Sequence, residues 1–306
     1  MELEYHVVDV FTTTPLEGNP LAVFPDATGL DTNTMQRIAR EFNLSETTFI
    51  LPAQSRADAT RVRIFTPGAE MEFAGHPTIG TAYVMRRLNL VSPQAATFTL
   101  DENIGPVNVR VDAGEDPILW LTMPEIREAG EIPRSLCARA VSLSENDLLP
   151  TLPCEVLSAG NPTLFIPLKD AASVDRASVD TAALTIAQQQ CAAPCVFVFA
   201  PTSAGAYSRM FARDLGVSED PATGSATGPL ATYMMRHGLV ARADGTRFVS
   251  EQGYKMGRPS VLHVLVHGSG GEAGIEVGGN VAYVATGRLS LPSLASERQP
   301  DVSICR

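Results

Sequence analysis

Glu46 is an acidic residue in a stretch whose neighbours are apolar and strand-like. Before it, residues 35–42 carry apolar side chains at the i, i+3, i+4 and i+7 positions of one helix face. After it, residues 47–51 are β-branched and apolar up to Pro52, which is typical of a strand entering a core. A carboxyl group at such a junction loses water, so its pKa rises toward the range of a general acid/base. The alternative is a surface turn glutamate or a helix-capping partner.

Two glycine-rich loops are predicted to open helices, and they are Gly75-His76-Pro77 and Thr223-Gly224-Ser225. A helix start leaves free N–H groups and a positive dipole end, and glycine lets a ligand approach that backbone closely. Pro77 suits a first helical turn because it holds the helical dihedral and needs no donor there. The two loops therefore predict two anion-binding helix ends that face one cleft, with ordinary helix capping as the alternative.

Four polar residues near these loops are further candidates. His76 is placed to donate to a ligand, or is an ordinary loop histidine with internal partners. Asp220 precedes a proline, so it is a turn aspartate or a second acid/base across the cleft from Glu46. Asn19 and Asn161 also precede prolines, and they either shape turns or reach the ligand.

The composition excludes some classes of partner. The chain has 306 residues and a formal net charge of -11, which offers no basic surface to a nucleic-acid backbone or an anionic membrane. A small anionic substrate is still compatible with this charge if backbone amides bind it. The start of the chain is acidic and no apolar run approaches the roughly 18 residues of a membrane span, so we expect a cytoplasmic protein without membrane segments.

The cysteines do not suggest a metal site. There are five of them, without metal-type spacing against histidines: Cys137, Cys154, Cys191, Cys195 and Cys305. We expect reduced and mostly buried thiols. The pair Cys191 and Cys195, beside Pro194, leaves a redox-active alternative open.

The second half of the sequence repeats the first. A strand is expected at residues 5–11, and the landmarks that follow recur in the same order, with residues 17–24, 63–65 and 73–83 matching residues 159–166, 209–211 and 222–233. Further strands are expected near residues 96–100, 107–111 and 118–123. The sequence thus predicts an α+β fold of two pseudo-symmetric lobes, residues 1–125 and 126–306, whose C-terminal strands cross back to the first lobe or stay in the second.

Several segments together resemble the phenazine biosynthesis PhzF-like family, which has the diaminopimelate epimerase fold; they are residues 17–20, 43–49, 65–67, 73–77, 219–226 and 252–260. The resemblance implies two similar domains, each a sheet wrapped around a central helix, with the active site between them. It also implies a homodimer. The epimerases of the wider fold use one cysteine from each loop, and the matching positions here are Ala74 and Thr223, so a two-thiol racemase is not expected.

The resemblance further implies a cofactor-independent isomerase of a hydroxylated cyclohexadiene carboxylate, in which the residue matching Glu46 moves the proton. It places His76, Asp220 and Ser225 in the same pocket, with the glycine and serine amides of the helix starts near the substrate carboxylate. Our catalytic candidates are therefore Glu46, Asp220 and His76, and our candidates for substrate binding are Asn19, Ser45, Gly75, Asn161, Gly224 and Ser225. The counterpart of Glu46, near Pro194, carries no acid, and one base favours isomerisation over inversion. The alternatives are a two-base epimerase that uses Glu46 with Asp220, and a carboxylate-binding protein without turnover.

Overall fold

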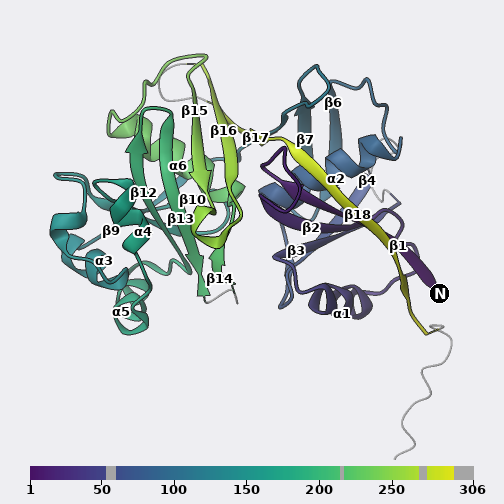
Figure 1. The fold of residues 1–306 in the computed structure, drawn as a ribbon, viewed down its shortest axis with the longest axis horizontal. Helices are drawn as coiled ribbons and strands as arrows, with labels where there is room; N and C mark the ends of the chain where they lie inside the picture. The colour runs from purple at the N-terminus through teal and green to yellow at the C-terminus, as the bar shows by residue number, and fades with distance from the viewer. Residues whose placement is uncertain (53–59, 214–216, 269–273, 293–306) are drawn as a thin grey trace, which may run out of the picture.

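The computed structural model describes residues 1–52, 60–213, 217–268 and 274–292. These residues form two halves that lie side by side, each with strands arranged around one long helix (Figure 1). The two helices are α2 (Gly75–Arg87) in the first half and α6 (Gly224–Arg236) in the second. The α+β fold class, with two pseudo-symmetric parts that each surround a central helix, is therefore confirmed.

The first half contains the elements that carry Glu46 and the Gly-His-Pro loop. Its outer helix is α1 (Thr32–Phe42), which begins after the N-cap Asp31. Glu46 is the first residue of a strand, and three residues separate it from the end of the helix. The strands are β1 (Glu2–Val10), β2 (Asn19–Phe24), β3 (Glu46–Leu51), β4 (Thr60–Phe65), β5 (Glu70–Met71), β6 (Thr97–Glu102), β7 (Gly105–Val111) and β8 (Leu119–Thr122).

The second half has the same central elements and an additional outer layer of helices. These helices are α3 (Arg134–Ala140), α4 (Ala171–Arg176) and α5 (Thr181–Cys191), with short 3-10 turns η1 (Glu145–Asp147) and η3 (Tyr254–Met256). Its strands are β9 (Arg127–Ile132), β10 (Cys154–Ser158), β11 (Thr163–Pro167), β12 (Cys195–Thr202), β13 (Gly205–Ala212), β14 (Val217–Asp220), β15 (Arg247–Gln252), β16 (Ser260–His267) and β17 (Gly274–Gly279). The last strand, β18 (Val281–Ser290), follows.

The internal repeat predicted from the sequence is visible in the way the strands of each half pair. In the first half β2 pairs in parallel with β3, β3 is antiparallel to β4, and β4 is parallel to β6. In the second half β11, β12, β13 and β15 pair in the same order and in the same directions. The two halves therefore share one topology.

The repeat extends to side chains. In the first half Arg63 Nε donates to Glu70 Oε1 at 2.7 Å, and the guanidinium lies over the ring of Phe65. In the second half Arg209 Nε donates to Glu219 Oε1 at 2.9 Å, over the ring of Phe211. Both arginines stand at the same register position, opposite β3 and β12 respectively.

Two pairings connect the halves. β8 is antiparallel to β17, and β18 returns to run antiparallel to β1 along its whole length. Figure 1 shows β18, in yellow, crossing from the second half to the first. The strands thus form one continuous sheet. The domain boundary predicted near residue 125 stays a prediction.

The strand expected at residues 5–11 ends one residue earlier. Phe11 has a φ of +67°, so the backbone turns there. Its N–H donates to Asn280 O at 2.9 Å, and its carbonyl accepts from Val261 N at 2.8 Å. Contacts with strands near the end of the chain therefore decide this backbone, and they are not visible in the local pattern.

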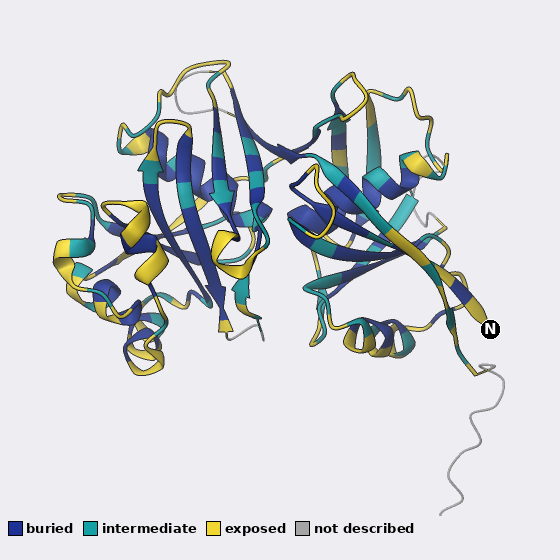
Figure 2. Ribbon diagram, viewed as in Figure 1, coloured by how far each residue is buried: buried dark blue, intermediate teal, exposed yellow. Residues whose placement is uncertain are grey.

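The two central helices are buried almost all round. Ile79, Ala82 and Met85 of α2 belong to the hydrophobic core of the first half. Leu230, Ala231 and the residues around Tyr233 of α6 belong to that of the second. Figure 2 shows both helices in dark blue, whereas the outer helices expose one face. The first turns of α2 and α6 are consequently held by packing on all sides.

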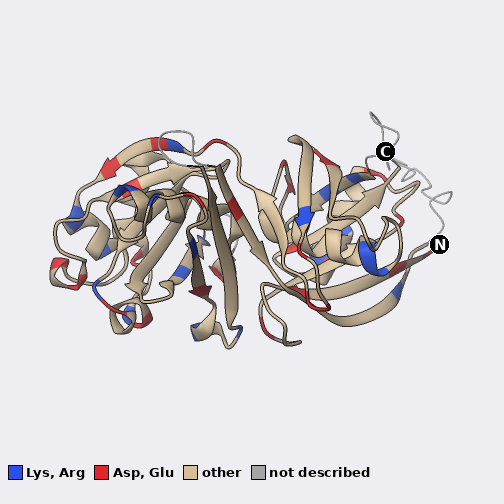
Figure 3. Ribbon diagram, turned by 90° about the horizontal axis from the view of Figure 1, so that it is seen from above, with Lys and Arg blue, Asp and Glu red and all other residues tan. Residues whose placement is uncertain are grey.

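The surface carries scattered charges. Lys and Arg are spread over both halves and alternate with Asp and Glu (Figure 3). None of the helices in the described parts of the chain is both long and apolar enough to cross a membrane. The absence of nucleic-acid and membrane partners stays a prediction.

Replacement of Gly80 by Ala should destabilise the protein by about 1–3 kcal/mol, because the new methyl group overpacks α2 against the sheet. A Cβ at Gly80 would lie 2.6 Å from Leu21 Cδ2 and 2.9 Å from Val10 Cγ2. Gly228→Ala in α6 is the matched control, since its Cβ would meet mainly the flexible side chain of Met123. Urea denaturation of both variants checks this, and equal losses would contradict it.

Candidate active site

The N-terminal ends of α2 and α6 meet. A Cβ added to Gly75 would lie 3.4 Å from Gly224 Cα and from Ser225 N. Neither N-cap residue, Ala74 or Thr223, caps its helix with a side-chain hydrogen bond. The first amides of both helices are therefore left for another acceptor, at a point where two positive dipole ends coincide.

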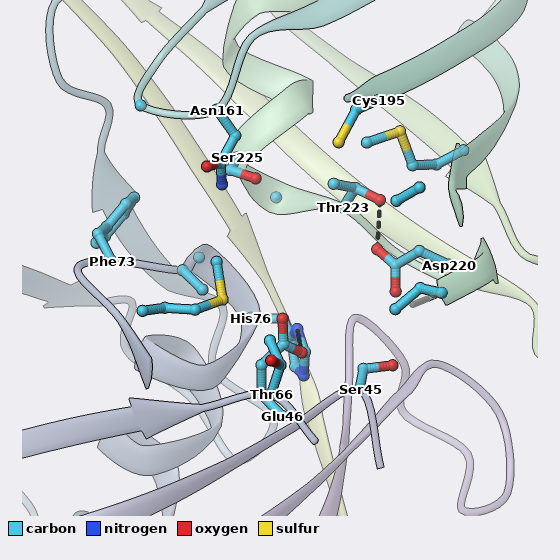
Figure 4. A pocket seen from close by; sticks show the side chains of 18 of the residues that line it. Ser45, Glu46, Thr66, Phe73, His76, Asn161, Cys195, Asp220, Thr223 and Ser225 are labelled. Atoms are coloured by element: carbon cyan, nitrogen blue, oxygen red, sulfur yellow. Dashed lines mark hydrogen bonds and ion pairs between the residues drawn. The ribbon is translucent and has the colours of Figure 1, made fainter. Parts of the chain in front are cut away.

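A cavity of about 680 Å³ lies at this point and is lined from both halves. Figure 4 shows Glu46, His76 and Ser45 grouped on the side of the first half, and Asn161, Ser225, Thr223 and Asp220 on the side of the second. The predicted site residues that line the cavity are Ser45, Glu46, Gly75, His76, Asn161, Asp220, Gly224 and Ser225. None of the described lining residues is Lys or Arg.

Glu46 enters the cavity from the start of β3. It pairs with Leu21 of β2, and its side chain is 15% exposed. Burial raises the pKa of Glu46 well above its usual range, and the nearby charge of Asp220 raises it further. Its Oε2 atom is buried and has no hydrogen-bond partner among the described residues. A carboxyl group whose pKa is raised in this way can take up a proton from a ligand and return it more readily than an ordinary glutamate.

His76 is the second residue of α2 and lies beside this carboxyl. Its Nδ1 is 3.3 Å from Glu46 Oε2. Burial lowers the pKa of His76 to about 3, so the imidazole is neutral at neutral pH. The contact is therefore between an imidazole and a weak acid rather than an ion pair. A neutral imidazole can donate one hydrogen bond and accept another.

Asp220 ends β14 and is held by a network of hydrogen bonds. Asn19 Nδ2 donates to Asp220 Oδ1 at 2.9 Å, and Thr223 Oγ1 donates to Oδ2. Gln252 Nε2 donates to the backbone carbonyl of Asp220 at 2.7 Å. Burial raises the pKa of Asp220 to about 6, although the hydrogen bonds from Thr223 and Asn19 oppose this rise. Asp220 is thus a rigidly oriented carboxyl group that titrates near neutrality.

Asn19 is not part of the cavity wall. It is fully buried, and its amide donates to Asp220 and, at 2.9 Å, to Ala222 O. The structure therefore places it behind the wall, where it connects the first half to the loop before α6. Both hydrogens of its amide bind protein acceptors, whereas its Oδ1 has no hydrogen-bond partner among the described residues, and the contact of Asn19 with substrate stays a prediction.

The counterpart of Glu46 in the second half is Cys195, one residue beyond the expected position near Pro194. Leu21 pairs with Glu46, and the matching residue Thr163 pairs with Cys195. Cys195 lines the cavity and is almost completely buried. The connection between α5 and β12 has the same length as that between α1 and β3, so the comparison of the two halves by sequence placed the counterpart one residue too early. The second half therefore presents a thiol where the first presents a carboxyl.

The rest of the wall is largely apolar. Met71, Phe73 and Ile104 contribute from the first half, and Met210 and Ala212 from β13. Sequence analysis did not assign these residues to the site, although Phe73 and Met210 lie in its repeated segments, because only the fold brings them to one cavity. They offer an apolar surface to the part of a ligand that points away from the helix ends.

The structure describes no cation-binding cluster. Among the described residues, no group of three or more His, Cys, Asp or Glu side chains is placed to hold a metal ion. Cys137, Cys154 and Cys195 are buried and Cys191 is half-buried, while Cys305 lies outside the described residues.

Comparisons with known proteins agree with the fold. The family model for phenazine biosynthesis-like proteins matches residues 8–287. The trans-2,3-dihydro-3-hydroxyanthranilate isomerase of Pseudomonas aeruginosa is 38% identical, covering 94% of this chain and 99% of that protein. A Bacillus anthracis phenazine biosynthesis protein of the PhzF family has a TM-score of 0.85 at 25% identity, covering 95% of this chain and 100% of the other. A Pseudomonas aeruginosa structure described as a predicted epimerase has a TM-score of 0.82 at 34% identity, covering 95% of this chain and 100% of the other.

The fold and these relatives define an isomerase. The chain belongs to the PhzF family of phenazine biosynthesis-like proteins, in agreement with the resemblance seen in its motifs. The individual roles of the site residues stay predictions.

Replacement of Thr223 by Val should raise the pKa of Asp220 above its value of about 6, because the hydrogen bond that stabilises the charged form is lost. Thr223→Ser keeps the donor and should leave the midpoint close to that of the wild type. Carbon-13 NMR titration of labelled aspartate carboxyl groups measures the shift, with Asp220→Asn to assign the signal. An unchanged midpoint in Thr223→Val would contradict the role of this hydrogen bond.

Proposed function

We propose that the protein is a cofactor-independent isomerase that moves a proton on a small carboxylate substrate, with Glu46 as the general acid/base. The observation that carries this proposal is the state of Glu46. Its carboxyl group lies in the cavity with a raised pKa, and its buried Oε2 lies 3.3 Å from His76 Nδ1 and accepts no hydrogen bond from the described residues. A group that can keep and return a proton near neutral pH is what such a reaction requires.

The paired helix ends would bind the carboxylate of the substrate. The amides of Gly75 and His76 in α2, and of Gly224 and Ser225 in α6, belong to first helical turns that no side chain caps. Because no described lining residue is Lys or Arg, backbone amides and helix dipoles would supply the positive potential. An anion there would also relieve the repulsion between the two dipole ends.

One carboxyl acid/base favours relocation of a proton over inversion. Glu46 would remove a proton from one carbon of a conjugated substrate and return it to another on the same face. The equivalent position in the second half is Cys195, so the repeat does not supply a second carboxyl there. His76, neutral at working pH, interacts with the backbone of Pro20 and would hold the carboxyl group of Glu46 in place through the contact at Nδ1.

The substrate of one relative suggests the reaction. The 38% identical Pseudomonas aeruginosa protein is named a trans-2,3-dihydro-3-hydroxyanthranilate isomerase. A ring of that kind carries a carboxylate for the helix ends and a conjugated system over which a proton can be moved. We propose the same class of reaction here, on a cyclic unsaturated carboxylate.

A two-base epimerase is the second candidate, because Asp220 is also buried, lines the cavity and titrates near neutrality. Its two hydrogen bonds from Asn19 and Thr223 favour an orienting role over a mobile base. Incubation in deuterium oxide with cyclic and acyclic α-substituted carboxylates separates the candidates. Deuterium incorporation with double-bond migration supports the isomerase, and incorporation with inversion supports the epimerase; binding without exchange indicates a carboxylate-binding protein.

Glu46→Gln should lower the rate of solvent-deuterium incorporation into trans-2,3-dihydro-3-hydroxyanthranilate by about 10²- to 10⁴-fold, because the proton carrier is lost. The affinity for anthranilate, a stable carboxylate probe, should be retained, since the amides of the helix ends are unchanged. Mass spectrometry and calorimetry measure the two quantities.

Glu125→Gln is the matched control, because this glutamate is exposed and pairs only with Arg127 among the ion pairs of the described residues. This variant should incorporate solvent deuterium into the substrate at the wild-type rate. Exchange by Glu46→Gln at that same rate would remove Glu46 from the proposed role. The homodimer and the cytoplasmic location implied by the resemblance stay predictions, and light scattering during gel filtration tests the first.

A further inference from the structure

Glu102 is a buried carboxyl group behind the cavity wall that the proposed mechanism does not use. It is the last residue of β6 and only 2% exposed. Its neighbour two residues on, Ile104, lines the cavity and donates its N–H to the carbonyl of Glu72, which also lines it. Glu102 therefore lies close to the site without forming its surface.

The contacts of Glu102 with α2 involve a single hydroxyl group. Thr78 Oγ1 is 2.7 Å from Glu102 Oε1 and 2.8 Å from the carbonyl oxygen of Ala74. Thr78 is fully buried, and a hydroxyl group has one hydrogen to donate. If Thr78 donates to Ala74, a charged Glu102 would face only lone pairs at Oγ1. A protonated Glu102 supplies the missing hydrogen, so that each short contact has its own donor.

The surroundings of Glu102 also disfavour a charge. Its Oε2 is buried without a hydrogen-bond partner among the described residues. The charged group that acts on it is Arg61 of β4, whose guanidinium donates to Asp101 O and to Asn103 Oδ1. On β7 the residue opposite is Gly105, and α2 contributes Thr78, so neither offers a charge. Burial raises the pKa of Glu102 to about 8, although Thr78 and Arg61 oppose the rise.

We infer that Glu102 is a protonated carboxylic acid at neutral pH, which donates to Thr78 Oγ1 and so positions the first turn of α2, and that its ionisation at alkaline pH weakens carboxylate binding. Glu102 is thus a positioning residue for the anion site. Ala74, at the end of this hydrogen-bond chain, is the N-cap of α2 and lines the cavity.

The link to binding is electrostatic. A negative charge on Glu102 would lie next to the first turn of α2 and would cancel part of its positive potential. No described Lys or Arg lines the cavity to compensate. This inference rests on the proposed carboxylate site for its effect on binding, whereas the protonation of Glu102 can be measured without a ligand.

Infrared difference spectroscopy tests the protonation. At about pH 7 the wild type minus Glu102→Gln should show the carbonyl stretch of a protonated carboxylic acid, and this band should disappear as the pH is raised through about 8. Identical spectra of the two proteins in this region would overturn the inference. If Glu102→Gln folds poorly, the band can be titrated in Glu46→Gln, where the other carboxyl group with a strongly raised pKa is absent.

Stability gives a second measurement without ligand. A carboxyl group whose folded-state pKa is raised costs stability as the pH rises from its unfolded pKa to its folded pKa. Glu102→Gln lacks this loss, so its urea midpoint should exceed that of the wild type by a gap that widens up to about pH 8 and then stays constant. Glu125→Gln, on the surface, should show no such widening. A gap independent of pH would overturn the inference.

Anthranilate binding tests the effect on the site, because the probe itself does not titrate between about pH 7 and about pH 10. Above pH 8 the wild type should lose affinity by up to about tenfold per pH unit relative to Glu102→Gln, with equal affinities at pH 7. Parallel pH profiles would overturn the link between Glu102 and the anion site. Failure of both proteins to bind anthranilate at any pH would count against the proposed function, while the infrared band still decides the state of Glu102.

Discussion

The contact between the N-termini of α2 and α6 is the interaction on which the rest of the structure depends. Gly75 and Gly224 approach so closely that a Cβ on either would contact the backbone of the other helix. This contact brings two positive dipole ends together, an arrangement that costs free energy unless negative or strongly polar groups lie nearby. Glu46, Asp220 and Glu102 are all found in this region. The cavity is best understood as the place where that unbalanced potential is left open to a ligand.

Burial then determines the chemistry of the groups around the helix ends. It raises the pKa values of the three carboxyl groups and lowers that of His76 to about 3. At neutral pH the site therefore contains a neutral imidazole, an Asp220 that titrates at about pH 6, and two further carboxyl groups whose charged forms are disfavoured by burial. Such groups can exchange protons with a substrate without a large change in charge. The same burial explains why the cavity can hold several carboxyl groups and still accept an anion.

The two halves have similar backbones, but they place different side chains in the site. Arg63 and Arg209 make equivalent ion pairs, and both halves pair their strands in one order. At the start of the equivalent strands, however, the first half has Glu46 and the second has Cys195. The repeat thus supplies two similar helix ends for binding, while a single half supplies the carboxyl for proton transfer. This asymmetry is what connects a symmetric fold to a reaction on one face of a substrate.

The sequence alone determined the two-fold repeat, the central helices, the family and the polar residues proposed for the cavity other than Asn19. These features follow from local patterns, since apolar periodicity, glycine-rich helix starts and the strand after Glu46 are properties of neighbouring residues. Only the tertiary structure decided which side chains reach the cavity. It moved Asn19 behind the wall, identified Cys195 as the counterpart of Glu46, ended β1 before Phe11, and brought Glu102 to Thr78. Each of these depends on contacts between residues far apart in the chain, and the hydrogen bonds and burial that such contacts create cannot be read from one segment.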